Sequence, residues 1–124
     1  ISHMAKIIRD SQKVEIQDSF GANVAGTFGT FSSSDTSPSV LGGNLWKTHA
    51  SAQTLTTFDD GVVGQIITVI STDAVVFDAT ADNLKCGSTN ITTASGDVTN
   101  WVYDGTNWYL INFMNQSENL SAGH

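Results

Sequence analysis

The sequence predicts an all-β protein, and three observations carry that prediction. Helix-forming residues never gather into a run with 3.6-residue apolar spacing, so no amphipathic helix is expected. Residues 61–70 form an apolar run that begins at a glycine, which is typical of a strand. In residues 101–109, Asp104-Gly105 separates two aromatic segments, as in a β-hairpin. The short intervals between turns favour a small antiparallel β-sandwich or barrel-like domain, preceded by an extended Gly/Ser-rich segment.

The amino-terminal part of the chain differs in pattern from the rest. Residues 1–4, Ile-Ser-His-Met, resemble a cloning scar and are left out of the fold argument. Residues 5–43 are expected to be an extended connector, because they contain several glycines and a serine run. The apolar residues within 6–9 and 13–17 indicate a short strand in each of these two segments. A solvated linker does not need Phe20, Phe28 and Phe31. We therefore expect this segment to pack along a larger body, such as a neighbouring subunit.

Strands and turns alternate from residue 44 to residue 113, which we expect to be the β domain, and a polar tail follows at 114–124. The predicted strands are residues 45–48, 54–57, 65–71, 74–77, 83–85, 90–92, 98–103 and 108–113. Asp, Asn or Gly supplies the backbone geometry of the turns between them. Residues 66–70 are almost continuously apolar, so that strand is expected to be central and covered on both faces.

The side chains of the last hairpin can be assigned to two faces. A two-residue turn at Asp104-Gly105 would place Trp101 opposite Trp108, whereas a four-residue turn at 104–107 would place Tyr103 there. Either turn gives the same faces, because side chains alternate along a strand. One face carries Trp101, Tyr103, Trp108 and Leu110, and the other carries Val98, Val102, Tyr109, Ile111 and Phe113. A domain of this size buries one such face, so the second is a candidate subunit contact or ligand platform.

Composition excludes several classes of function. The 124 residues suit one domain, and 12 acidic against 5 basic residues give a formal net charge of −7. An anionic surface repels phosphate, so nucleic acid is not an expected partner. No apolar run approaches the roughly 20 residues that cross a bilayer, so no membrane insertion is expected. Cys86 is the only cysteine, which excludes an intramolecular disulfide and a cysteine-based zinc site. We expect it to be a small side chain that is buried or half-buried.

Residues with catalytic or metal-binding chemistry are present but not arranged in a motif. No histidine lies at a motif spacing from a nucleophile that it could activate. The three histidines are His3, His49 and His124. Most aspartates lie at predicted turns, where Asp serves backbone hydrogen bonding, so a pair of glycosidase carboxylates is not indicated. Asp78, Asp82 and Asn83 offer oxygens to calcium but lack an EF-hand loop. We therefore expect no enzyme activity, no cofactor and no metal.

Several motifs, taken in order, resemble the carboxy-terminal region of bacteriophage tailspikes. They are Ser-Pro-Ser-Val at 37–40, Gly-Asn-Leu-Trp-Lys-Thr at 43–48, the run 54–69, Ala-Ser-Gly-Asp at 94–97 and the run 103–109. The resemblance covers residues 36–113. It implies that a depolymerising β-helix precedes this chain, and that the chain trimerises and caps the fibre. It also implies a location in the virion tail, outside the cell when mature and assembled in the host cytoplasm.

The aromatic residues are the constellation most relevant to function. Such rings can stack on sugars, or they can fill the core and a subunit interface. Because of the resemblance to tailspikes, we expect these rings to fill the core and a subunit interface. The candidate residues are Trp46, Trp101, Tyr103, Trp108 and Leu110. The favoured function is a structural domain that forms a homotrimer, and the alternative is a carbohydrate-binding module that recognises a bacterial surface polysaccharide.

Overall fold

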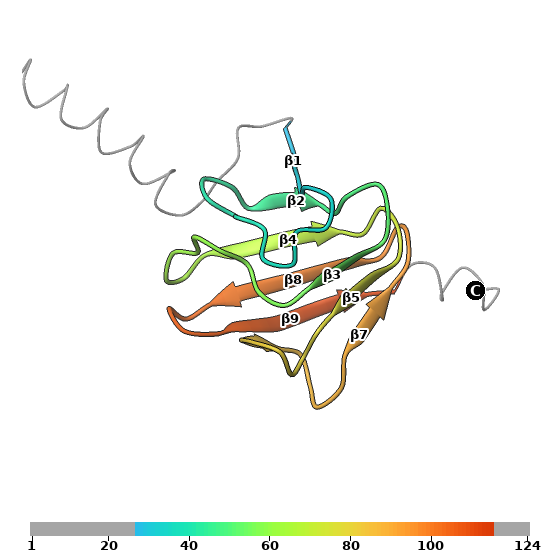
Figure 1. The fold of residues 1–124 in the computed structure, drawn as a ribbon. Coiled ribbons are helices and arrows are strands. Elements are labelled where there is room, and N and C mark those ends of the chain that lie inside the picture. Colours follow the sequence, from blue (N-terminus) through green and yellow to red (C-terminus); the bar gives the residue numbers. More distant parts are fainter. Residues whose placement is uncertain (1–26, 116–124) are drawn as a thin grey trace, which may run out of the picture.

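The computed structural model describes residues 27–115, which form a β-sandwich without a helix (Figure 1). This confirms the predicted all-β sandwich. The strands of the described part are β1 (Gly29–Thr30), β2 (Leu45–Lys47), β3 (Gln53–Leu55), β4 (Ile66–Ile70), β5 (Val75–Phe77), β6 (Leu84–Lys85), β7 (Ile91–Thr93), β8 (Val98–Tyr103) and β9 (Trp108–Met114). Each of the eight strands predicted after residue 44 occurs, with ends within two residues of the prediction. The strands predicted at 6–9 and 13–17 lie outside the described residues.

Two mixed sheets make up the sandwich. The larger has the order β1-β2-β4-β8-β9-β6, and the smaller has the order β3-β5-β7. β1, β2 and β4 are parallel to one another, whereas β8 is antiparallel to both β4 and β9. The pairing is therefore not purely antiparallel as expected. The chain crosses to the other sheet between β2 and β4, and such a crossover returns the chain in its original direction.

The first half of the domain winds as three stacked coils, each of which passes through both layers. Coil 1 is residues 29–40, coil 2 is residues 45–59 and coil 3 is residues 66–77. Parallel pairs join each coil to the next: Gly29 with Trp46, Leu45 with Thr68, Gln53 with Val75, and Ser39 with Asp59. These partners lie 17 to 23 residues apart along the chain. This winding is that of a short parallel solenoid, in which each repeat contacts its neighbours.

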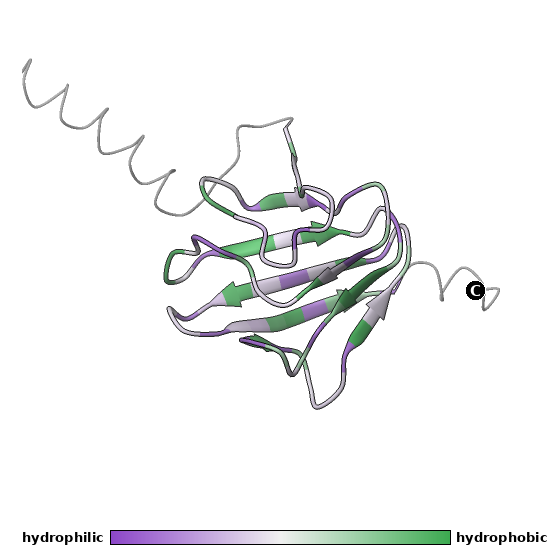
Figure 2. Ribbon diagram, viewed as in Figure 1, coloured by the Kyte–Doolittle hydropathy of each residue, from purple (hydrophilic) through white to green (hydrophobic). Residues whose placement is uncertain are grey.

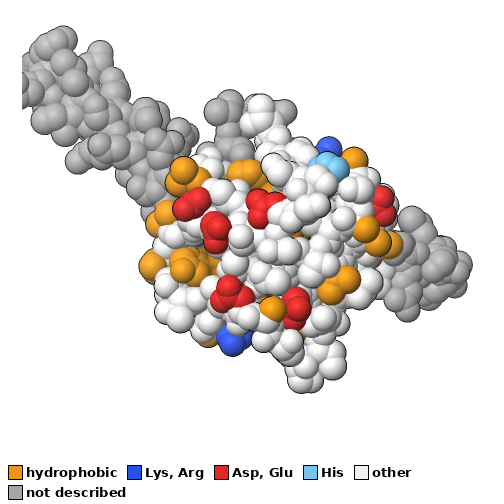
Figure 3. Space-filling view, viewed as in Figure 1, with side chains coloured by type: hydrophobic (Ala, Val, Ile, Leu, Met, Phe, Trp, Pro, Cys, Tyr) orange, Lys and Arg blue, Asp and Glu red, His pale blue; other side chains and the backbone are white. Residues whose placement is uncertain are grey.

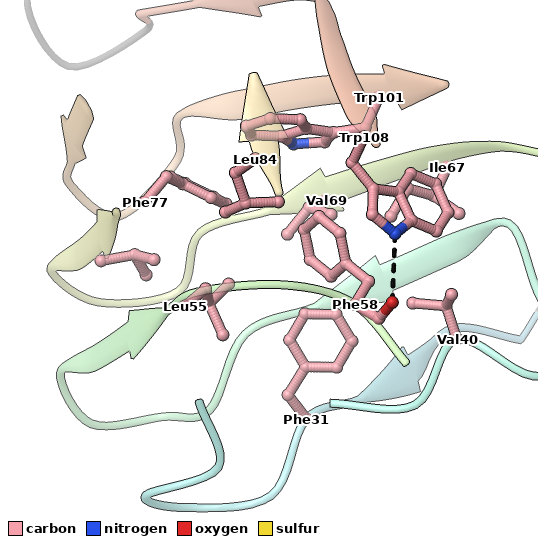
Figure 4. Packing of buried hydrophobic residues seen from close by; sticks show 11 residues of the cluster. Phe31, Val40, Leu55, Phe58, Ile67, Val69, Phe77, Leu84, Trp101 and Trp108 are labelled. Atoms are coloured by element: carbon pink, nitrogen blue, oxygen red, sulfur yellow. Dashed lines mark hydrogen bonds between the residues drawn. The ribbon is translucent and has the colours of Figure 1, made fainter. Parts of the chain in front are cut away.

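A core of aromatic and aliphatic side chains fills the space between the sheets (Figure 4). Its buried hydrophobic residues are Phe31, Val40, Leu55, Phe58, Ile67, Val69, Val75, Phe77, Leu84, Trp101 and Trp108. Phe31 and Val40 precede residue 44, so the described part of the predicted connector contributes to this core. The larger body on which Phe31 packs is the domain itself.

The central strand β4 is covered on one face and open on the other. Ile67 and Val69 are fully buried, but Ile66 is 51% exposed. Our expectation that both faces are covered is therefore wrong within this chain, because the smaller sheet covers the larger one on one side only. Figure 2 shows the apolar segments of β8 and β9 interrupted by hydrophilic residues, without strict alternation. Within residues 27–115, no helix has the length and apolar character that a bilayer crossing requires.

Candidate functional site

The last hairpin has the four-residue turn that the sequence left as one of two alternatives. Tyr103 pairs with Trp108. The Asp104 N–H donates to the Asn107 carbonyl at 3.1 Å, while Asp104 Oδ1 accepts from the N–H groups of Asn107 at 2.7 Å and Thr106 at 2.8 Å. These hydrogen bonds, of which the one from Asn107 has the largest effect, lower the pKa of the Asp104 carboxyl below its ordinary value of 3.8. The aspartate therefore serves the turn, as its position predicted.

The inner face of the hairpin carries the predicted aromatic residues. Trp101 and Trp108 are both 0% exposed. The Trp101 indole N–H donates to Thr99 Oγ1 at 2.9 Å, and the Trp108 indole N–H donates to the Phe58 carbonyl at 3.1 Å (Figure 4). Phe58 meets the two indoles edge to face, with ring centroids 5.7 and 5.3 Å away. Both tryptophans are thus enclosed by their own chain, and neither presents a ring surface to a sugar or a subunit in this fold.

The other three candidate residues lie at the margin of the core. Tyr103 is half-buried and stacks on Trp108 with centroids 4.7 Å apart. Leu110 is half-buried opposite Trp101. Trp46 lies two strands from the hairpin, on β2, where it stacks on Phe31 at 5.6 Å. The structure therefore brings four of the five candidates together on one hairpin face and places the fifth elsewhere in the same core.

The loop before β4 covers the aromatic stack of Tyr103 and Trp108. A Cβ atom added at Gly61 would lie 2.6 Å from Cζ2 of Trp108 and 2.9 Å from Cδ2 of Tyr103. The next turn is fixed to the same hairpin, because the Gly64 N–H donates to the Tyr103 carbonyl at 2.8 Å. The close contact of this loop with Tyr103 and Trp108 therefore requires glycine at position 61.

The opposite side of the hairpin forms a surface that we call the outer face. Its apolar residues are Ile66 and Ile70 of β4, Val98 and Val102 of β8, and Tyr109, Ile111 and Met114 of β9. Ile66, Val102 and Tyr109 are paired across the three strands. Ile66, Tyr109, Ile111 and Met114 are 51%, 40%, 53% and 43% exposed. Sequence reasoning found Val98, Val102, Tyr109 and Ile111. It omitted Ile66 and Ile70 because it considered the hairpin alone, and Met114 because the predicted strand ended at residue 113.

A β-bulge corrects one part of the predicted face assignment. The register of β8 and β9 shifts between Asn100 and Trp101, so Ile111 is the extra residue. Phe113 consequently lies opposite the buried Thr99, on the inner side, and its assignment to the outer face is wrong. One inserted residue reverses the alternation of everything beyond it.

A ladder of polar side chains crosses the middle of the outer face. The Asn112 amide donates to Asn100 Oδ1 at 3.3 Å, and the Asn100 amide donates to Thr68 Oγ1 at 2.7 Å. Strands β4, β8 and β9 contain no charged residue. Figure 3 shows several carboxylates on the side of the molecule that carries the smaller sheet. The outer face is thus apolar and amide-rich in a protein that is acidic overall.

The remaining residues with reactive chemistry are engaged locally. His49 Nδ1 lies 2.8 Å from Ser51 Oγ, whereas His3 and His124 lie outside the described residues. The N–H of Thr80 lowers the pKa of Asp78, and Asn83 binds Thr57 and Thr106. Residues 27–115 contain no group of three His, Cys, Asp or Glu side chains placed to hold a metal ion.

Cys86 is half-buried, as expected. Burial raises the pKa of its thiol, and the negative charge of Asp78 adds to that effect. A raised pKa keeps the thiol protonated and therefore weakly nucleophilic.

Comparison with known proteins identifies the family of the domain. Residues 29–109 match the family described as phage depolymerase C-terminal beta sandwich domain. The matched segment starts at β1 and contains all three coils, the smaller sheet and the turn of the last hairpin. A search of curated proteins gave no match. The match covers more than half of the chain and confirms the tailspike resemblance, so the chain belongs to the family of phage depolymerase C-terminal β-sandwich domains.

Proposed function

We propose that this chain is a structural domain at the end of a phage tailspike, where it forms a homotrimer and caps the fibre. Depolymerase activity then belongs to a β-helix that precedes the domain in the same tailspike, and the domain itself has no catalytic role. The site of action is the tail of the virion. The observation that supports the proposal is the outer face of the larger sheet.

The outer face has the composition of a subunit interface. Four exposed apolar side chains lie on β4 and β9, on either side of the half-buried Val102 of β8, and exposed apolar surface of this kind marks interaction sites. The centres of interfaces are poor in charged residues, as these strands are. Copies of a chain with a net charge of −7 repel one another, so they approach most easily through a surface without carboxylates.

The polar ladder is compatible with burial at such an interface. Asn100 both donates to Thr68 and accepts from Asn112, so its amide has partners on each side. A polar group with partners can be covered without the free-energy cost of a buried, unsatisfied donor. The enclosed tryptophans support the face from beneath and do not contact the partner.

The alternative function is a carbohydrate-binding module for a bacterial surface polysaccharide. Tyr109 favours it, because an exposed aromatic ring shares the outer face with the amides of Asn100 and Asn112. Rings with neighbouring amides suit the apolar faces and hydroxyls of sugars. Under this alternative, Tyr109 contacts the sugar, and the two enclosed tryptophans do not.

Light scattering on the purified chain tests the proposal. The expected mass is that of a trimer, and Ile111→Asp should convert it to a monomer with unchanged strand content, because the carboxylate enters the apolar face. Leu41→Asp is the matched control, since Leu41 is 68% exposed and lies outside that face. A monomeric wild type at micromolar concentration, or a trimeric Ile111→Asp variant, would refute the proposed assembly. Glycan binding that is lost in Tyr109→Ala while the trimer persists would establish the alternative.

A further inference from the structure

The stack of coils ends differently on its two sides. Beyond coil 3, β8 runs antiparallel to β4, so the parallel winding stops there. Beyond coil 1, the described residues contain no further strand: β1 is the edge of the larger sheet (Figure 1). In the second layer, residues 36–39 lie beside coil 2 and form the corresponding edge. We call β1 and residues 36–39 together the open edge.

Backbone groups of the open edge point away from the stack. The Phe31 N–H donates to the Lys47 carbonyl at 2.9 Å, so by strand alternation the N–H and C=O of Thr30 face outward. In the second layer, the Pro38 carbonyl and the Val40 N–H bond to Asp59 at 2.8 and 2.9 Å, which turns the backbone groups of Ser39 outward. Such an edge is a template for another parallel strand in each layer.

The core near the open edge also contains an unpaired polar atom. The indole nitrogen of Trp46 is buried and has no hydrogen-bond partner among the described residues. Its ring lies against β1, because a Cβ atom at Gly29 would be 2.0 Å from the ring atom Cζ3. Buried donors in native proteins are almost always paired. This unpaired donor therefore lies beside β1, at the open-edge end of the core.

We propose that one more parallel coil docks on the open edge, and that residues 6–17 of this chain supply it. The coil spacing of 17 to 23 residues, counted back from Gly29 and Thr30, reaches residues 6–13. That interval contains the strand pattern at 6–9. A step of 20 to 22 residues back from residues 36–39 reaches 14–19, which overlaps the pattern at 13–17.

The spacing within a coil agrees with this assignment. β2 and β3 begin at residues 45 and 53, and β4 and β5 begin at 66 and 75. The two sequence patterns begin at residues 6 and 13, a similar interval. Residues 6–17 lie outside the described part of the structure, so the assignment rests on their sequence and on the open edge. The proposal is independent of the trimer, because it concerns an edge of the sandwich and not the outer face.

Disulfide cross-linking in the complete 124-residue chain tests the proposal. In a Cys86→Ser background, Thr30→Cys is combined in turn with a cysteine at Lys6, Ile7, Ile8 or Arg9. Paired strands lie about 4.8 Å apart, within the roughly 4.4 to 6.8 Å between Cα atoms that a disulfide bridges. One or two of the four pairs should form an intramolecular disulfide under mild oxidation. A mass loss of about two hydrogens and faster migration on a non-reducing gel report it.

Thr92→Cys, combined with the same four cysteines, is the matched control. Thr92 is an exposed threonine on the edge strand β7, which belongs to the smaller sheet and lies away from coil 1. Cross-linking of Thr30 no greater than that of Thr92 would overturn the proposal. Disulfides only between chains would also overturn it and would indicate pairing of two copies through the open edge. Light scattering on the same samples measures the oligomeric state separately. A failure of the proposed trimer can therefore be distinguished from a failure of the proposed coil.

Discussion

The indole N–H of Trp108 donates a hydrogen bond to the backbone carbonyl of Phe58 across 50 positions of sequence, at 3.1 Å. Phe58 closes coil 2, and Trp108 begins the last strand. Their rings also meet at 80° with centroids 5.3 Å apart. One buried contact thus joins the coiled half of the domain to the antiparallel hairpin that carries the outer face.

This contact predicts a graded response to substitution of Trp108. Trp108→Phe keeps a ring but leaves the Phe58 carbonyl unpaired, which should lower the free energy of unfolding by about 1 to 3 kcal/mol. Trp108→Ala also removes the packing and should cost about 3 to 5 kcal/mol. Urea unfolding measures both. Thr54→Ala, at an exposed position of β3, should stay within about 0.5 kcal/mol of the wild type. If Trp108→Phe is as stable as the wild type, the hydrogen bond contributes nothing.

The contact of Gly61 with the aromatic stack predicts that Gly61→Ala is destabilising. The added methyl would overlap Trp108 at 2.6 Å, and an enclosed ring has little room to move. Overpacking of this kind costs about 1 to 3 kcal/mol. Near-ultraviolet circular dichroism should change as well. Gly42→Ala is the comparison, because Gly42 has a φ of +73° but no atom within 4 Å of its added Cβ, so only backbone strain is introduced there. Identical aromatic spectra for Gly61→Ala and the wild type would contradict the predicted overlap.

A buried glutamine joins the coils and should be sensitive to an apolar replacement. Gln65 Nε2 donates to the carbonyls of Val40 and Gly43 at 3.0 and 2.7 Å, and its Oε1 accepts from the Val62 N–H at 2.9 Å. Gln65→Leu removes all three of these buried hydrogen bonds, so the loss should exceed about 2 kcal/mol. Thermal unfolding measures it. Ile66→Leu, at the exposed neighbouring position, should change stability little, and equal melting of the two variants would exclude the role assigned to Gln65.

Local patterns predicted the strands well because alternation and turn residues act over a few positions. The placement of Trp101, Tyr103, Trp108 and Leu110 on one face follows from that alternation. The bulge that moves Phe113 inward has no sequence signal of its own, because any residue can be the inserted one. Strand β1 escaped detection because Gly29 and Thr30 form a strand only through parallel pairing with distant residues.

The candidate site was harder to predict than the strands. Both hairpin faces are apolar in sequence, so residue identity could not decide which one the smaller sheet covers. The coils decided it, because Leu55 and Phe77 of the smaller sheet occupy the same buried layer as the tryptophans. The apolar side chains of β4, notably Ile66, then extended the opposite face beyond the hairpin. This long-range pairing is a property of the folded chain and not of any local motif.

Asp104 predicts a pH dependence of stability at the hairpin turn. Its pKa is lowered from 3.8 by the N–H groups of Asn107 and Thr106, which favour the carboxylate in the folded state. A group whose folded pKa is depressed stabilises the fold above its unfolded pKa, and this contribution is lost as pH falls through the folded value. The wild type should therefore melt higher than Asp104→Ala at pH 7. The difference should shrink as pH falls below 3.8 and reach a minimum once the carboxyl is protonated.

Asp104→Asn separates this titration from the shape of the turn. The amide oxygen can still accept from Thr106 and Asn107, but the side chain does not titrate. The melting difference between the Asn and Ala variants should therefore stay constant from pH 7 to pH 2, because every other carboxyl titrates equally in both. The difference between the wild type and either variant should decrease with acidification. If the wild type and Asp104→Ala differ equally at both ends of the range, the Asp104 charge does not stabilise the turn, and hydrogen bonding by a neutral acceptor is sufficient.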